Sequence, residues 1–231
     1  MAIYAISDLH LSLSMDKPMD VFGSGWTGYM DKIKKNWELK ITPDDFVIIP
    51  GDISWATYIE QAYEDFRFIE SLPGKKIISK GNHDYWWTTM SKLDKYVEGN
   101  GFRTINFLHN NSYDFGQLVL CGTRGWKSPG DDGITSEDVK IFEREVQRLD
   151  LSLSDGSKNG KDIIAALHYP PFNARKEPTK IVDILKKYSV KTCVYGHLHG
   201  ESSKNAFRGE YSGILFELVS ADFINFDPVK L

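Results

Sequence analysis

Several short apolar stretches of this sequence run directly into polar side chains that could bind a metal ion. The stretches cover residues 2–6, 46–49, 76–79, 163–167 and 192–195, and the polar residues after them are Asp8, Asp52, Asn82 with His83, His168 and His197. Each stretch has the length of a buried strand. The carboxyl ends of strands in an α/β sheet line one crevice, so these side chains should converge there. The pattern predicts a site at that edge.

Helical patterns separate the strands in the first half of the chain. Helices are predicted over 30–39, 57–71 and 88–97, and further ones over 137–151, where Thr135 and Asp138 fit a capping box, and 180–188. Strands that alternate with helices indicate an α/β class. Four other strands are predicted over 104–108, 117–121, 206–207 and 211–219, which suggests a partly antiparallel addition.

Composition limits the class of protein. The 231 residues suit one domain over 1–231, and a net charge of -4 gives no electrostatic reason to expect a nucleic-acid partner. Cys121 and Cys193 lie in apolar runs and are interpreted as buried thiols in a reducing compartment. The chain starts in a strand pattern without a charged leader, and no apolar stretch could span a bilayer. We expect a cytoplasmic protein without a membrane partner.

The histidines strengthen the prediction of a metal site. Of the 6 histidines, all except His109 follow predicted strands, namely His10, His83, His168, His197 and His199. Imidazoles combined with carboxylates and an amide, without thiolates, suit ions such as Mn, Fe or Zn. The candidates are too many for one tetrahedral ion. Two divalent or trivalent ions that share a carboxylate fit them better.

These motifs also carry a family resemblance. In chain order they are Asp8-Leu9-His10, Gly51-Asp52, Gly81-Asn82-His83-Asp84, His168 and Gly196-His197-Leu198-His199. Together they resemble the calcineurin-like metallophosphoesterase superfamily, a group of metal-dependent phosphoric ester hydrolases. The resemblance implies a four-layer α/β/β/α sandwich with two mixed β-sheets, in which the metal site lies at the carboxyl ends of the strands.

The resemblance implies a role for each motif residue. Asp8, His10 and His199 would bind one ion, Asn82, His168 and His197 the other, and Asp52 would bridge them. Two such ions favour a bridging hydroxide that attacks phosphorus in line. His83 is left without a ligand role and could act as the general acid. Asp84 could orient His83 or a ligand histidine, or could cap the following helix.

The substrate is expected to be a small phosphomonoester or phosphodiester. Arg124, in a Gly-rich loop, could clamp a phosphate, and Trp126 could stack on an aromatic group; a salt bridge and core packing are the alternatives. For Trp86 and Trp87 packing is preferred. A nuclease and a catalytically silent scaffold of the same fold are the alternative functions.

Overall fold

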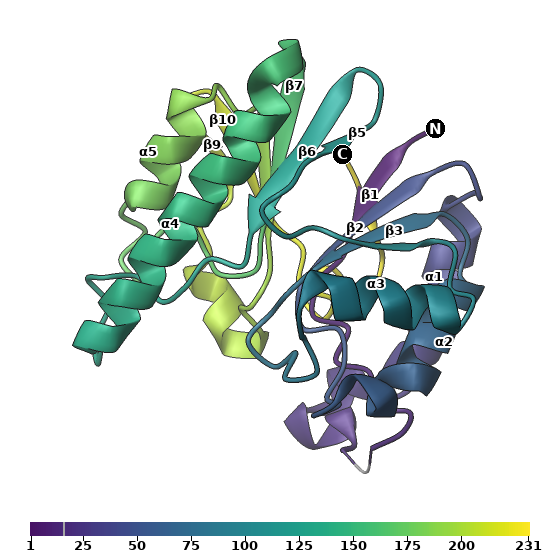
Figure 1. The fold of residues 1–231 in the computed structure, drawn as a ribbon. Coiled ribbons are helices and arrows are strands. Elements are labelled where there is room, and N and C mark those ends of the chain that lie inside the picture. The colour runs from purple at the N-terminus through teal and green to yellow at the C-terminus, as the bar shows by residue number, and fades with distance from the viewer. Residues whose placement is uncertain (16) are drawn as a thin grey trace. The chain divides into compact units, whose positions relative to one another are not determined.

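Residues 1–15 and 17–231 are described by a computed structural model, and they form two units with one β-sheet each (Figure 1). The first unit comprises Met1–Phe107 and Val219–Leu231. The second unit comprises Leu108–Leu218. Each unit therefore contains some of the motif residues and can be described by itself.

The sheet of the first unit has five strands in the order β11-β1-β2-β3-β4. Their bounds are β1 Ile3–Ala5, β2 Phe46–Pro50, β3 Lys75–Ser79, β4 Ile105–Phe107 and β11 Val229–Lys230. The strands β1 to β4 are parallel, and β11 joins the edge antiparallel to β1. Parallel pairing brings the carboxyl ends of β1, β2 and β3 to the same edge.

Three helices pack on one face of this sheet. They are α1 Tyr29–Lys40, α2 Tyr63–Ser71 and α3 Met90–Gly99. Val47 and Ile49 share a face because side chains alternate along a strand, and they join one apolar core with Trp37 and Phe66 from the helices. This core fixes where the strands end.

Lys76 on β3 is an unusual buried cation in the first unit. Its Nζ donates a hydrogen bond to the Leu72 carbonyl oxygen and another to Thr104 Oγ1 at 3.0 Å. Burial lowers the pKa of Lys76 to about 8, and the nearby Glu70 carboxylate opposes that shift.

The sheet of the second unit has six strands in the order β5-β6-β7-β8-β10-β9. Their bounds are β5 Tyr113–Asp114, β6 Leu118–Thr123, β7 Asp162–Leu167, β8 Thr192–Tyr195, β9 Gly209–Tyr211 and β10 Ile214–Leu218. The four central strands are parallel, and the two edge strands are antiparallel to their neighbours. The loops after β6, β7 and β8 therefore leave the same edge of the sheet.

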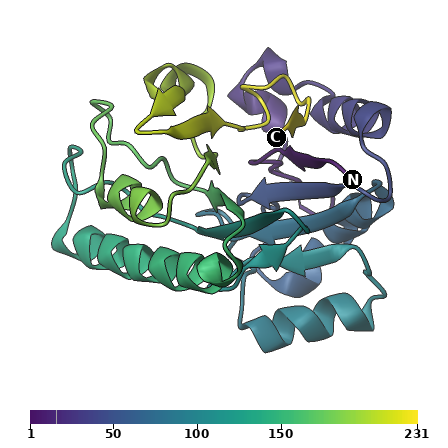
Figure 2. The same cartoon turned by 90° about the horizontal axis from the view of Figure 1, so that it is seen from above.

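Two helices complete the second unit. The helices α4 Ser136–Gly156 and α5 Lys180–Lys187 lie next to each other, and α4 packs on β6 (Figure 2). The predicted capping box is confirmed, because Thr135 Oγ1 accepts from the Asp138 N–H at 3.1 Å and Asp138 Oδ2 accepts from the Thr135 N–H at 3.0 Å. Cys121 and Cys193 are buried and free.

The prediction of an α/β fold with two mixed β-sheets is confirmed. One predicted strand was wrong, because residues 206–207 are not in a strand. The strand predicted over 211–219 is confirmed in part: β10 lies within it, and a turn at Ser212 and Gly213, both with positive φ, separates β10 from β9. The helix predicted over 137–151 continues to Gly156 in the structure, beyond its expected end. Within the described part of the chain, no helix is long and apolar enough to cross a lipid bilayer.

Candidate metal centre

In the first unit, backbone hydrogen bonds join the loops after β1 and β2. The Asp8 N–H donates to the Gly51 carbonyl oxygen at 3.0 Å, and the His10 N–H donates to the Asp52 carbonyl oxygen at 2.9 Å. The Tyr29 hydroxyl donates to the His10 carbonyl oxygen at 2.9 Å. These bonds hold the two motif loops together at the carboxyl edge of the sheet.

Four of the predicted ligands have left-handed backbone conformations. The φ angle is 58° at Asp8, 46° at His10, 51° at Asp52 and 73° at His197. This region costs a non-glycine residue roughly 1–3 kcal/mol and persists where surrounding contacts impose it, often at functional sites. The strained turns therefore support a functional role for these loops.

The Asp52 carboxylate is buried, with 1% of its side chain exposed. Its Oδ1 accepts a hydrogen bond from the His83 backbone N–H at 2.8 Å. Its Oδ2 lies 3.7 Å from Nε2 of His10. One oxygen is thus fixed by the loop after β3, and the other faces a predicted ligand.

Gly81 lies very close to Asp52, with no room for a side chain between them. A Cβ atom at this position would lie 2.1 Å from Asp52 Oδ1 and 2.3 Å from the Asp52 backbone nitrogen. Such distances are far below van der Waals contact, so a larger residue would displace Asp52. The next residue, Asn82, is half-buried beside it.

Asp84 holds the loops after β2 and β3 together. Its Oδ2 accepts from the backbone N–H groups of Gly81 at 2.7 Å and Asp52 at 2.9 Å, and its Oδ1 accepts from Ile53 at 2.8 Å and from the Trp86 indole at 3.0 Å. Burial raises the pKa of Asp84 to about 6, while these hydrogen bonds oppose the shift. At pH 7 the carboxyl is therefore mostly ionised.

The expected capping role of Asp84 was wrong, because the N-cap of α3 is Thr89. The recorded partners of the Asp84 carboxylate are backbone amides and an indole, not an imidazole. Asp84 therefore positions the backbone that carries Asp52 and Gly81. It acts on the site through these loops.

Aromatic rings surround the histidines of the first unit. The His10 ring stacks on Trp55, with centroids 4.9 Å apart and planes inclined by 23°. The His83 ring lies 4.4 Å from Trp55 and 5.6 Å from His10. Sequence reasoning missed Trp55, although it follows the Gly51-Asp52 motif by only a few residues. Trp86 packs in the core against Phe66, as expected.

In the second unit, the loops after β7 and β8 bring three histidines to one edge. The His168 N–H donates to the Arg124 carbonyl oxygen at 3.0 Å, and the Gly196 N–H donates to the His168 carbonyl oxygen at 3.1 Å. The rings of His168 and His197 lie 5.1 Å apart. The His199 N–H donates to Ser202 Oγ at 2.9 Å, at the start of a short 3-10 helix.

Arg124 and Trp126 are tied to each other and to α4. The Arg124 guanidinium carbon lies 4.3 Å from the Trp126 ring centroid, and Nη2 lies 3.3 Å from Glu145 Oε1. The Trp126 indole donates to Asp138 Oδ1 at 2.9 Å. The salt bridge that the sequence raised as an alternative for Arg124 is thus present, and Trp126 is half-buried against the Arg124 guanidinium and not in the core. The substrate roles of both residues stay predictions.

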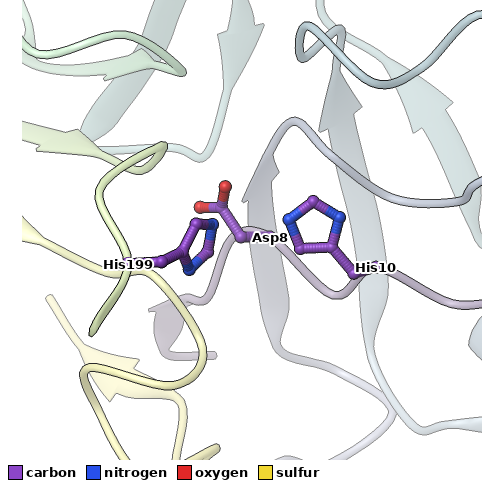
Figure 3. A group of neighbouring side chains, drawn as sticks. All are labelled: Asp8, His10 and His199. Carbon is purple, nitrogen blue, oxygen red and sulfur yellow. The ribbon is translucent and has the colours of Figure 1, made fainter. Parts of the chain in front are cut away.

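Two groups of Asp and His side chains could each hold a metal ion. The first is Asp8, His10 and His199, and the second is Asp52, His168 and His197. Figure 3 shows the first group, with Asp8 and His10 on the loop after β1 and His199 on the loop after β8. Buried carboxylates such as Asp8 need compensating positive charge, and a nitrogen–oxygen donor set suits first-row ions.

Solved structures of other proteins share the fold of this chain. Solved structures similar to the chain include a protein of unknown function from Aquifex aeolicus (19% identical, TM-score 0.53, covering 99% of this chain and 95% of that one). Another is a phosphopantetheinyl hydrolase from Mycobacterium tuberculosis (14% identical, TM-score 0.58, covering 100% and 95%). A Thermus thermophilus protein is 10% identical, with TM-score 0.56 and coverage of 99% and 97%.

The search of curated proteins gave no match. The model of the family described as "Calcineurin-like phosphoesterase" matches residues 1–201, and this range includes every motif residue discussed above. The chain therefore belongs to the calcineurin-like phosphoesterase family.

Proposed function

We propose that the protein is a phosphoesterase that uses two metal ions to hydrolyse a small phosphomonoester or phosphodiester. The observation that carries the proposal is the pair of Asp and His groups, each able to offer three ligand atoms. Family membership supports the same reaction class. We further propose a cytoplasmic location, which the two buried free thiols, Cys121 and Cys193, favour.

The proposal assigns the ligands by group. Asp8, His10 and His199 would hold one ion, His168, His197 and the amide oxygen of Asn82 the other, and Asp52 would contact both. When bound, such ions lower the pKa of water towards neutrality and neutralise charge on the phosphoryl oxygens. Mn, Fe and Zn suit the donor set.

His83 is the proposed general acid. Its backbone N–H is anchored to Asp52 Oδ1, and its ring lies 4.4 Å from Trp55 and 5.6 Å from His10. The imidazole is thereby kept beside the ligands without a ligand role of its own. It would donate its proton to the oxygen of the departing alcohol.

The test combines metal analysis with hydrolysis by purified protein. We expect wild type to hold two ions and to hydrolyse phosphoesters, and Asp52→Asn to lose metal and activity together. His83→Ala should keep its metal but lose ~10²–10⁴ in rate on esters with poor leaving groups, and less on good ones. Loss of both ions from His83→Ala would refute its role as general acid.

A substrate screen would define the reaction further. It should include phosphomonoesters, phosphodiesters and single-stranded nucleic acid, together with phosphopantetheine esters, because one similar structure is a phosphopantetheinyl hydrolase. Asp44→Asn is a suitable control, because Asp44 is exposed in the turn before β2 and away from both groups. Wild-type protein that holds no metal and cleaves none of these esters would contradict the proposal.

A further inference from the structure

A cavity of ≈ 270 Å³ lies beside His197, and every residue around it belongs to the second unit. Its walls include Trp126, Ser128, Tyr169, Phe172, Leu198 and Phe207. Several of these follow β6, β7 or β8 directly, at the edge of the sheet where ligands bind in α/β proteins. The volume lies just below the range of roughly 300–1,000 Å³ that is typical of ligand sites, and it suits one ring system.

Four aromatic side chains, Trp126, Tyr169, Phe172 and Phe207, line the cavity. The Phe172 and Phe207 rings are stacked, with centroids 4.1 Å apart and planes inclined by 24°. Tyr169 links the cavity to the metal ligand, because its ring lies 4.1 Å from His197 and 5.2 Å from Trp126. A planar group bound here would thus lie next to the reacting phosphate.

One wall residue has an unused polar group. Ser128 is 4% exposed, and its Oγ has no hydrogen-bond partner among residues 1–15 and 17–231. The Oγ atom itself is closed to solvent, so the hydroxyl must rotate towards the cavity before a ligand atom can bond to it. An unsatisfied buried hydroxyl costs about 1–3 kcal/mol, and such a bond would remove that cost. Benzene-like rings offer no such atom, whereas heteroaromatic rings do.

The charges around the cavity argue against a phosphate inside it. Two wall residues, Asp131 and Asp132, carry carboxylates. The Nζ atom of the wall residue Lys127 lies 3.8 Å from Asp138 Oδ1, and this carboxylate partly balances the positive charge of the lysine. The cavity therefore suits an uncharged ring better than an anion.

We propose that this cavity binds a heteroaromatic group of the substrate, such as a nucleobase, and sets the specificity of the enzyme. The idea that this group belongs to a phosphoester rests on the proposed function. The binding of the ring itself does not depend on that function.

The kinetic test uses adenosine 5′-monophosphate, phenyl phosphate and ribose 5-phosphate as probes. We expect kcat/KM for the adenosine ester to exceed that for ribose 5-phosphate by about tenfold to a hundredfold, as base stacking allows. Phe207→Ala should remove most of this advantage and should leave kcat/KM for ribose 5-phosphate within about twofold of the wild-type value. Ser128→Ala should lower kcat/KM for the adenosine ester and spare phenyl phosphate.

Control variants lie on exposed parts of the same unit. Leu215→Ala on β10 and Ser154→Ala on α4 should leave all three probes unchanged. Thermal unfolding of each variant shows whether it is folded. Ser128→Ala is small enough to test the proposal if Phe207→Ala does not fold.

A calorimetric measurement of adenosine binding to the full chain separates the proposal for this cavity from the proposed function. Binding that Phe207→Ala and Ser128→Ala weaken supports the cavity even if no ester is hydrolysed, and in that case only the proposed function fails. Hydrolysis of ribose 5-phosphate and the adenosine ester at equal kcat/KM, without adenosine binding, overturns the cavity proposal and leaves the proposed function intact.

Discussion

Replacing Asp84 by Asn tests whether one buried carboxylate holds the first-unit part of the metal centre together. Besides the bonds already described, Asp84 Oδ1 accepts from the Ser54 N–H at 3.3 Å. Asn keeps the size of the side chain but turns one acceptor oxygen into a donor group. Whichever oxygen is replaced, at least two buried N–H donors lose their acceptor.

The cost follows from those donors. An unsatisfied buried donor costs about 1–3 kcal/mol, so two of them cost about 2–6 kcal/mol. That is a large part of a typical unfolding free energy of about 5–15 kcal/mol. The Asp52 N–H is among the Oδ2 donors, and Ile53 and Ser54 are among the Oδ1 donors, so either orientation of the amide disturbs the loop after β2.

The assay is urea unfolding of metal-free protein, followed by metal titration of the folded variant. Asp84→Asn should lose at least about 2 kcal/mol of unfolding free energy and bind metal more weakly than wild type. Asp94→Asn, on the exposed face of α3, is the matched control and should change the free energy by less than about 0.5 kcal/mol. An Asp84→Asn variant with wild-type stability and metal affinity would refute the positioning role.

Three other predictions concern the backbone and a buried cation. Gly81→Ala should abolish metal binding because its Cβ would collide with Asp52, a proposed ligand, whereas Gly99→Ala, with open space around it, should keep full metal content. The pKa of Lys76 falls from 10.5 to about 8 on folding, so the folded state binds fewer protons than the unfolded state between these pH values, and the unfolding free energy should rise with pH. In urea unfolding, wild type should gain about 1 kcal/mol from pH 7 to pH 9 relative to Lys76→Met. An equal pH dependence of the two proteins would contradict this. His197 has a positive φ, so the unfolding free energy of metal-free His197→Gly should exceed that of His197→Ala by about 1 kcal/mol in the same urea assay. At His168 the order of the Gly and Ala variants should reverse.

The sequence was sufficient to predict most strands and the residues that form the two Asp and His groups, because both depend on local patterns. Apolar runs of strand length identify β1, β2, β3, β7 and β8, and parallel pairing then brings the residues after them together. The turn at Ser212 and Gly213 also had a local signal, a Ser-Gly pair inside an apolar run, which sequence reasoning overlooked.

The end of α4 could not be predicted in this way, because tertiary contacts decide it. Residues 152–156 are rich in Ser, Asp and Gly, which favour a loop. In the structure, Ser152 Oγ donates to the Asn111 carbonyl oxygen at 2.6 Å and accepts from the Gly122 N–H at 2.9 Å. A Cβ at Gly156 would lie 2.3 Å from Cys121 Sγ, so the glycine allows the helix to pack on β6. These bonds outweigh the local preference.

The proposed metal ligands and the proposed specificity residues differ in how far a local sequence pattern reveals them. A ligand needs only to end a strand, so its position follows from a pattern along the chain. Ser128, Tyr169 and Phe207 each suggest ordinary packing when taken alone, and their common cavity depends on how separate loops of the second unit come together. The residues proposed to bind metal and those proposed to set specificity can therefore change independently of each other. Substitutions at Ser128 or Phe207 should alter the substrate preference without loss of metal.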